Sequence, residues 1–445
     1  MKFEKTFYVI LSGIVITAFL LITYVFPTGS GLQTAKVHAT KIYYVDNISK
    51  AHQKIIDAFN KKYAGQIEVE AINLSFDKFS TNERKELLAR YLRNKSDRID
   101  VFAVDQIWVP RFAKWAVPLT PYYSIKERRR LLQNALETCV YNDSLMAFPL
   151  YIDIAHLYYR DDLLRKLPNY YEIKAKLNSS ITWEDFAELS KKLSPNKNPF
   201  YVFQADNYEG LICSFFEMMA NNKRSFFKND TLYLNETGFK KVLYQLAKMI
   251  YTDKVSPEKV LELKENESTD YFLKEKSFSV RGWSSLKERE TSPEYAAVLK
   301  NLQRAPAPHF EGERPTSVFG GWNLMISKYS TKVSEAVKFI NFFAGEESQK
   351  IMFNEVGYLP VLNFFYEDNG SHREQFIYND PGLIFYKNLM KQGIHRPFFK
   401  KYTIVSDILA AAIHSALKKE TNIDAAVKTA YEKIRKAGIN IEAAK

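Results

Sequence analysis

The stretch MAFPLYIDIAHLYY, Met146–Tyr159, is an extended and largely apolar run that contains Pro149. Strands in globular proteins usually have about 5–6 residues, so this run is too long for one ordinary strand. We therefore expect it to cross from one part of the molecule to another. The chain of 445 residues is long enough for two lobes with separate cores. Pro306–Pro315 is loop-like and is a second expected crossing.

Upstream of this run, strand-like and helix-like segments alternate. The strand-like segments are Lys41–Asp46, Ile67–Ile72 and Ile99–Val104, and the helix-like segments between them are Lys50–Tyr63 and Glu83–Arg93. Such alternation predicts a mostly parallel sheet covered by helices. Ligands bind such sheets in crevices at the carboxyl ends of the strands. Asp46 follows the first segment and Asp105 the third, so both are expected at that edge.

Downstream of the run, helical patterns predominate. Thr182-Trp-Glu-Asp185 is a capping box that predicts a helix through Leu193. Further segments with helical periodicity are Tyr208–Asn221, Phe239–Tyr251, Ser334–Ala344, Ile408–Lys418 and Ala425–Ala437. Two strand-like segments end at or contain Gly-Trp: Ser277–Trp283, and the segment that begins Phe319-Gly-Gly-Trp322. A bulky aromatic after a flexible glycine corner is either a plain strand entry or the wall of a binding cleft.

Composition and charge exclude several classes of function. The net charge of +12 is spread along the chain, and basic clusters such as Lys126–Arg130 are short, so the sequence does not favour nucleic-acid binding. Cys139 and Cys213 are the only cysteines. They could pair in an oxidising compartment or remain two buried thiols.

The N-terminus predicts a membrane anchor. Phe7–Phe26 is an uncharged run of roughly the twenty residues that a bilayer core requires. Lys2 and Lys5 precede it, which places the rest of the chain outside the cytoplasm. Val37-His-Ala39 is an alternative cleavage site for a signal peptide. We expect residues 1–39 to be an anchor or signal segment followed by a flexible tether.

No pattern of catalytic or metal-ligating residues stands out. The seven histidines form no His-x-x-x-His pair, and the chain has no Gly-x-Ser-x-Gly elbow and no phosphate loop. The chain instead carries carboxylates and aromatics near strand ends. Aromatic faces cover the C–H faces of sugars, and carboxylates accept hydrogen bonds from hydroxyls. The sequence therefore favours sugar binding without covalent chemistry.

Five segments in order resemble the extracellular solute-binding proteins of ABC importers, the group that includes the maltose-binding protein, and especially its trehalose/maltose/sucrose-binding branch. The segments are DVFAVDQIWVPRFAKW (Asp100–Trp115), AFPLYIDIAHLYYRDDLL (Ala147–Leu164), TWEDF (Thr182–Phe186), FQADNYEGLICSFF (Phe203–Phe216), and Gly320–Ile340 followed by Gly357–Val361. The resemblance extends from about Lys41 to Ile434.

This resemblance implies an α/β, two-lobed periplasmic-binding-protein type II fold behind the N-terminal transmembrane or signal-anchor helix. We expect residues 40–150 and about 305–355 in lobe 1, and residues 151–304 and about 356–445 in lobe 2. It implies a monomer that binds a di- or oligosaccharide and closes on it by a hinge. The expected partners are an ABC permease and, through it, an ATPase, with no cofactor, no metal and no nucleic acid.

The resemblance also implies a set of ligand-binding residues. The first set is Asp105, Asp153, Glu209, Trp283 and Trp322. The second set is Gln204, Tyr208 and Arg281, and the third is Asp46 and Tyr402. Two features differ from the family's pattern: no lipid-attachment cysteine follows the apolar run, and Val280-Arg-Gly precedes Trp283.

Three alternatives remain open from the sequence. The protein could present its ligand to a membrane sensor instead of a permease. It could bind a solute other than a sugar. It could also be an extracellular glycoside hydrolase, which needs two carboxylates facing each other at about 5–10 Å across a cleft.

Overall fold

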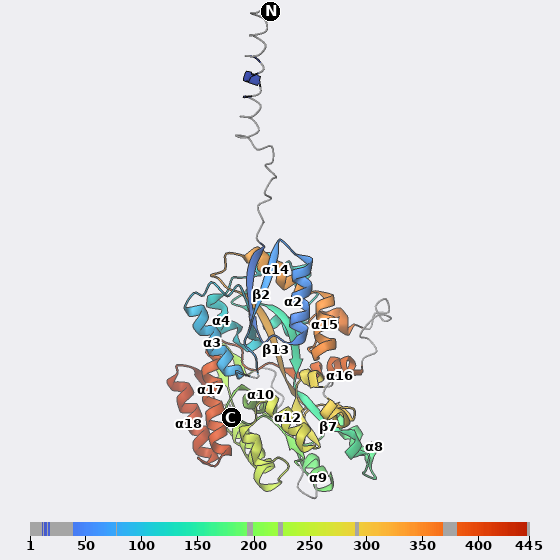
Figure 1. The fold of residues 1–445 in the computed structure, drawn as a ribbon. Coiled ribbons are helices and arrows are strands. Elements are labelled where there is room, and N and C mark those ends of the chain that lie inside the picture. The colour runs from blue at the N-terminus through green and yellow to red at the C-terminus, as the bar shows by residue number, and fades with distance from the viewer. Residues whose placement is uncertain are drawn as a thin grey trace, which may run out of the picture.

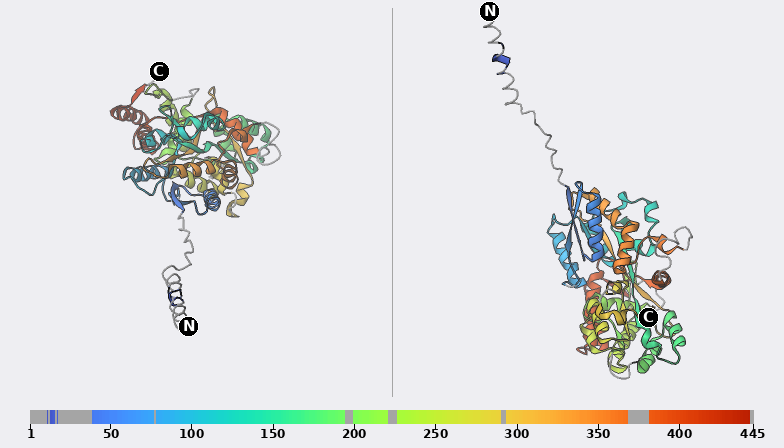
Figure 2. Two further views of the ribbon diagram at one scale, coloured as in Figure 1. Left: turned by 90° about the horizontal axis from the view of Figure 1, so that it is seen from above. Right: turned by 45° about the vertical axis from the view of Figure 1, so that its right-hand side comes forward.

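The computed structural model describes residues 11, 13–15, 17, 39–76, 78–193, 199–220, 226–289, 293–367 and 381–442. Within these residues the chain forms two α/β lobes, each built on its own main β-sheet (Figure 1). The first lobe holds a six-stranded sheet and the second lobe a four-stranded sheet. Figure 2 shows the two lobes from two further directions.

The first sheet begins as the alternating pattern predicts. β1 (Thr40–Asp46) pairs in parallel with β2 (Ile67–Asn73) and β3 (Val101–Asp105). The connections contain α2 (Lys50–Lys62) and α3 (Thr81–Arg93), and both helices begin with a capping box. The carboxyl ends of the three strands therefore lie at one edge of the sheet.

The centre of the first sheet is β13 (Ser317–Ile326), whose ten residues are all buried. It runs antiparallel to β3 on one side and to β6 (Phe148–Ile154) on the other, and its first residues pair with β14 (Gly393–Ile394). The predicted parallel arrangement holds for β1, β2 and β3. β13 adds antiparallel pairs because the chain returns to this sheet from the second lobe.

The second sheet has the strand order β12 (Leu302–Ala305), β7 (His156–Arg160), β11 (Ser279–Gly282) and β8 (Tyr201–Val202). The long extended run Met146–Tyr159 is divided between the two sheets. Its first part forms β6 in the first sheet and its second part forms β7 in the second sheet, with only Ala155 between them. Residues 306–316 lead back from β12 to β13. The expected lobe boundary at residue 150 falls inside β6.

Helices surround both sheets. They are α4 (Val109–Phe112), α5 (Ile125–Arg128), α6 (Gln133–Glu137), α7 (Asp161–Leu164), α8 (Tyr170–Ser179), α9 (Trp183–Leu193), α10 (Glu209–Met219), α11 (Glu236–Ala247), α12 (Glu265–Glu275), α13 (Ala296–Leu299), α14 (Val333–Phe343), α15 (Glu346–Val356), α16 (Pro381–Leu389), α17 (Tyr402–Leu417) and α18 (Ile423–Lys436). Short 3₁₀ turns include η1 (Gln106–Trp108), η6 (Ser284–Arg289), η8 (Asn363–Tyr366) and η9 (Met390–Gln392). Smaller strands are β4 (Val140–Tyr141), β5 (Ser144–Leu145), β9 (Phe227–Lys228), β10 (Thr231–Tyr233) and β15 (Asn440–Glu442). The predicted cap of α9 is present, because the Asp185 amide donates to Thr182 Oγ1 at 3.1 Å.

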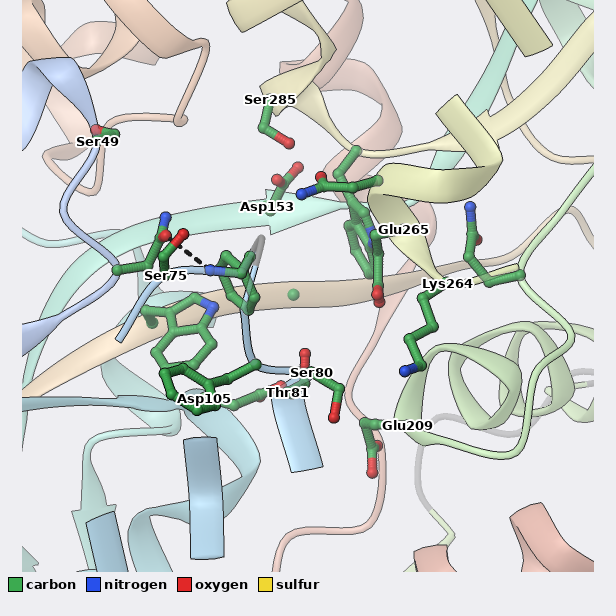
Figure 3. Close-up of a pocket in the computed structure, with 18 of the residues that line it drawn as sticks. Ser49, Ser75, Ser80, Thr81, Asp105, Asp153, Glu209, Lys264, Glu265 and Ser285 are labelled. Atoms are coloured by element: carbon green, nitrogen blue, oxygen red, sulfur yellow. Dashed lines mark hydrogen bonds between the residues drawn. The ribbon is translucent and has the colours of Figure 1, made fainter. Parts of the chain in front are cut away.

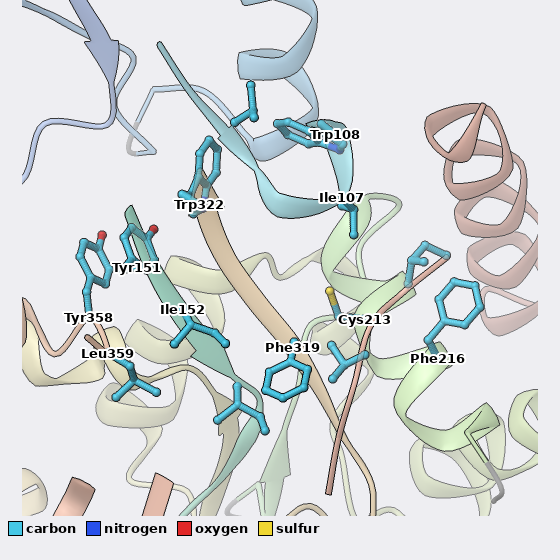
Figure 4. Packing of buried hydrophobic residues seen from close by; sticks show 14 of the residues in the cluster. Ile107, Trp108, Tyr151, Ile152, Cys213, Phe216, Phe319, Trp322, Tyr358 and Leu359 are labelled. Carbon is cyan, nitrogen blue, oxygen red and sulfur yellow. The ribbon is translucent and has the colours of Figure 1, made fainter. Parts of the chain in front are cut away.

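Buried aromatic side chains pack on both sides of β13 (Figure 4). The Trp108 and Trp322 rings meet edge to face at 5.8 Å, and Tyr151 stacks on Tyr358 with centroids 3.9 Å apart. Cys139 and Cys213 are both buried and free. The two cysteines are therefore separate buried thiols and do not form a disulfide.

The predicted anchor, Phe7–Phe26, falls almost wholly outside the described residues. No helix in the part of the chain that the structure describes is long and apolar enough to cross a membrane.

Candidate functional site

A cavity of about 650 Å³ lies at the carboxyl edge of the first sheet, and residues of both lobes line it. This volume is within the range of about 300–1,000 Å³ that small-molecule sites occupy. From the first lobe come residues of β6 and β13, the last residues of β2 and β3 (Asn73 and Asp105), and the segments that follow β1 and β2, including Asn47, Ser75 and Phe76. From the second lobe come the starts of α10 and α12 and the end of β11 with η6. Figure 3 shows Asp153, Glu209, Lys264 and Glu265 around this space.

The register of β13 brings the first-lobe side chains of the cavity together. Trp322 pairs with Asp105 on β3 and with Tyr151 on β6, and Gly320 pairs with Asp153. Alternate residues of a strand point to the same face, so Gly320 and Trp322 share one side of β13. Gly320 leaves room there for the Trp283 ring of the second lobe, because a Cβ on Gly320 would lie 2.7 Å from that ring.

Trp322 is surrounded by two aromatic rings and an arginine. Trp108 and Phe76 meet its ring edge to face, with centroids at 5.8 Å and 5.7 Å. The Arg84 guanidinium lies 4.2 Å from the centroid of the Trp322 ring and 4.2 Å from that of Phe76. A cation in this position is attracted by the aromatic face. These contacts hold the indole in place at the cavity wall.

Arg396 connects the two lobes across the cavity. It lies just after β14, and its guanidinium donates to Glu209 Oε1 at 2.6 Å and to Asp105 Oδ1 at 3.0 Å. Glu209, the first residue of α10, also accepts from the Tyr402 hydroxyl at 2.6 Å and from the Ser406 hydroxyl. Asp105 and Glu209 come from different lobes, so one buried cation compensates a carboxylate from each.

The environment shifts the pKa of several cavity carboxyls upward. Burial raises the pKa of Asp105, and the Arg396 guanidinium offsets part of this effect. Burial raises the pKa of Asp153 to about 7, against the backbone amides of Ser284 and Ile154 that hydrogen-bond to it. Burial also raises the pKa of Glu265. These carboxyl groups are therefore already partly desolvated before a ligand enters.

Acidic groups outnumber basic groups in the cavity. Among the lining residues that the structure describes, the carboxylates are Glu83, Asp105, Asp153, Glu209, Glu265 and Glu267, and the cations are Lys78, Lys264 and Arg396. Hydroxyl and amide side chains complete the polar lining. The cavity is thus rich in hydrogen-bond acceptors, which suits a ligand that donates hydrogen bonds and does not suit a polyanion.

The structure brings six of the predicted ligand residues to the cavity wall: Asp105, Asp153, Gln204, Glu209, Trp283 and Trp322. The Gln204 amide is engaged by its own lobe, since it donates to Ser268 Oγ at 2.6 Å and to the Arg281 carbonyl at 3.0 Å.

Four predicted residues lie behind the wall, not on it: Asp46, Tyr208, Arg281 and Tyr402. Asp46 pairs with Arg84 at 2.9 Å, and Arg281 pairs with Glu217 at 3.3 Å. Tyr402 donates to Glu209, and the Tyr208 ring folds back over Gly210. Each of them contacts a residue of the cavity wall or of a helix or strand that lines the cavity.

Sequence reasoning missed Arg396 and the polar residues after β1 and β2. Arg396 follows the two-residue strand β14 and precedes Pro397, in a segment without helical or strand periodicity. The neighbouring residues are mostly apolar, but the sequence alone does not show that this arginine is buried. Among the described residues, no group of three or more His, Cys, Asp or Glu side chains could hold a metal ion.

Comparisons with known proteins agree with this geometry. The family model for bacterial extracellular solute-binding proteins matches residues 46–350. A probable ABC transporter-binding protein of Deinococcus radiodurans is 24% identical over 391 residues, which cover 85% of this chain and 88% of that protein.

Solved structures share the whole two-lobed fold. Maltose-bound MalE3 of T. maritima is 25% identical, with a TM-score of 0.79, and the match covers 90% of this chain and 100% of that one. The substrate-binding protein Lmo0181 of Listeria monocytogenes, solved with cycloalternan, is 18% identical, with a TM-score of 0.72 over 90% of this chain and 100% of that one.

Proposed function

This chain belongs to the bacterial extracellular solute-binding proteins, and from that premise we propose that it binds a di- or oligosaccharide in the cavity between its lobes and delivers it to an ABC permease. The family consists of binding proteins, so the prediction that the chain is not an enzyme is confirmed. We further propose that the ligand resembles trehalose or maltose and that the N-terminal segment tethers the protein to the membrane.

The observation that carries the proposal is the pairing of aromatic and acidic groups from both lobes around one cavity. Trp322 and Asp105 come from the first lobe, and Trp283 and Glu209 from the second. Indole faces cover the apolar faces of sugar rings, and carboxylates accept from the hydroxyls at the ring edges. The excess of acidic groups supplies acceptors for the hydroxyls of such a ligand and disfavours an anion. The maltose complex of T. maritima MalE3 supports the same class of ligand.

Binding would close the molecule because the ligand touches both lobes. A solute that contacts Trp322 and Trp283 at once has a higher affinity for the state in which the lobes approach each other. The hinge would lie in the segments that cross between the sheets, at Ala155 and residues 306–316. The closed form would then be the one that docks on the permease.

The tether is inferred from sequence. The uncharged run Phe7–Phe26 would anchor the chain in the cytoplasmic membrane, and the following residues to Ala39 would link it to β1. These thirteen residues span at most about 47 Å when fully extended, so the first lobe would stay close to the membrane surface.

The proposal is tested by a thermal-shift screen with di- and trisaccharides, followed by calorimetry on the full chain. Amino acids, polyamines and polyols serve as the other ligand classes. A ligand at 100 times its Kd adds about 2.7 kcal/mol to the free energy of unfolding, enough to raise Tm measurably. We expect one disaccharide class to raise Tm, and Trp283→Ala to weaken its binding at least about tenfold, or ~1.4 kcal/mol.

The matched control is Tyr171→Ala, which removes an aromatic ring that is 84% exposed and lies outside the cavity. It should leave the affinity unchanged. A shift with a charged solute and none with any sugar would reject the sugar assignment and leave the solute-binding role. Equal affinities in the Trp283 variant and the wild type would reject the proposed site.

A further inference from the structure

We propose that the chain has a second ligand site, for a small organic anion, in a cavity of about 870 Å³ on the other face of the β13–β14 pair. Phe319 lines this cavity, whereas the next three residues, Gly320, Gly321 and Trp322, line the first cavity, in which the sugar is proposed to bind. His395 and Arg396 divide in the same way, one to each cavity. Successive side chains of extended backbone point to opposite faces, so the two strands form a shared wall.

Both lobes and a crossing segment contribute to this second cavity. Glu137 comes from α6 on the first-lobe side, and Ala220 follows α10 in the second lobe. Arg314 lies in the segment that leads from β12 to β13, and Gln392 ends η9. A molecule bound here would touch the parts of the chain that move relative to one another when the lobes close.

Buried polar atoms of the wall are left without partners. The Oε1 atom of Gln392 and both ring nitrogens of His395 are buried and form no hydrogen bond of ordinary geometry with the described residues, although the Asn134 backbone lies close enough to His395 to raise its pKa. His395 Nε2 is 3.9 Å from Glu137 Oε2, which is too far for a hydrogen bond. Buried polar groups without partners are costly, and a bound ligand or water would satisfy them.

The charges around the cavity select the kind of ligand. Arg314, Lys387 and Lys391 contribute three positive charges, and Glu137 contributes one negative charge. Burial lowers the pKa of His395 to about 4, so its neutral ring offers one donor and one acceptor near pH 7. Carboxylate and phosphoryl groups are the anions that Arg and Lys side chains bind best. A small molecule that bears such a group fits this arrangement.

The shared wall would couple the two sites. The Phe319 ring packs against Gly393 and lies 4.8 Å from the His395 ring. The Phe319 carbonyl accepts from Gln106 Nε2 at 2.8 Å, directly after Asp105 in the sugar cavity. An anion that shifts β14 would therefore shift Arg396 and its contacts. This coupling rests on the proposed sugar function, whereas anion binding itself does not.

Calorimetry on the full chain at low ionic strength tests the second site, with inorganic phosphate and citrate as separate probes for the phosphoryl and carboxylate classes. We expect saturable binding of at least one probe. The double variant R314Q/K391Q should weaken it at least tenfold. The control K126Q/K428Q removes two exposed positive charges outside both cavities and should leave it unchanged.

A second titration, in saturating maltose, separates the two cavities. An anion bound in the second cavity still binds when the sugar site is full, and the two affinities change each other by the same factor. Competition with maltose would place the anion at Arg396 and overturn the proposal. So would the absence of saturable binding, or equal binding by the wild type and R314Q/K391Q. If maltose does not bind, the disaccharide that raises Tm in the thermal-shift screen replaces it. If no sugar binds, the sugar function fails while the phosphate and citrate results stand by themselves.

Discussion

At the scale of single residues, Arg396 balances the buried negative charge of the cavity between the lobes. It is 2% exposed and compensates Asp105 and Glu209 together. Removing one partner of a buried ion pair leaves an uncompensated charge and costs about 3–5 kcal/mol. We expect Arg396→Met to lower the free energy of unfolding by this amount in urea titrations. Arg98→Met, at an exposed surface pair with Glu70, should cost less than about 1 kcal/mol. Similar losses in both variants would contradict this account.

Asp153 gives the stability of the protein a pH dependence of predictable sign. Its pKa is about 7 in the fold, above the value of about 3.9 for an unfolded chain. Between these pH values the folded state holds a proton that the unfolded state has released, so the contribution of Asp153 to stability falls as pH rises from about 4 to 7. Asp153→Asn should remove this fall. Urea unfolding of both proteins at pH 5 and pH 7.5 measures it, and parallel pH curves would refute the assignment.

At the scale of elements, β13 depends on a glycine that no other residue replaces. Gly321 has φ +132°, and a Cβ there would lie 2.5 Å from the Tyr151 carbonyl oxygen of β6. Gly321→Ala should therefore lose about 2 kcal/mol or more, since both backbone strain and a clash oppose it. Gly65→Ala is the matched control, with φ +77° and no atom within 4 Å. Its loss, from strain alone, should be about 1 kcal/mol, and a larger loss than at Gly321 would contradict the clash.

At the scale of the whole molecule, the lobes also meet outside the cavity. Asp407 of α17 accepts from Asn82 of α3 at 3.1 Å, and Arg111 of α4 donates to Thr403 at 3.2 Å. We expect these contacts to form only when the lobes are close, so Asp407→Ala should weaken sugar binding about two- to fivefold by destabilising the closed state. Small-angle X-ray scattering should show a smaller radius of gyration with sugar than without it. A radius that does not change on saturation would argue against closure.

The alternation of strand and helix between Lys41 and Val104 and the cap at Thr182 could both be predicted from the sequence. These features arise from interactions between residues close together in the chain, so the local pattern contains them. The length of the run Met146–Tyr159 likewise indicated a crossing. The predicted glycine corner was wrong, because Gly320 and Gly321 lie within β13, paired with β6. The family resemblance then placed Asp105, Glu209, Trp283 and Trp322 among the candidates for the site.

The tertiary structure alone decided how these pieces combine. Arg396 lies 187 residues from Glu209 and 291 from Asp105, and no local pattern connects them. Asp46 is the last residue of β1, close to the predicted place, yet it pairs with Arg84, 38 residues later, behind the cavity wall. The antiparallel register of β13 decides which side chains share a face, and that register depends on two strands far away in the sequence. The sequence by itself thus determined the elements and the class of ligand-binding groups, and long-range packing determined which of those groups reach the cavity.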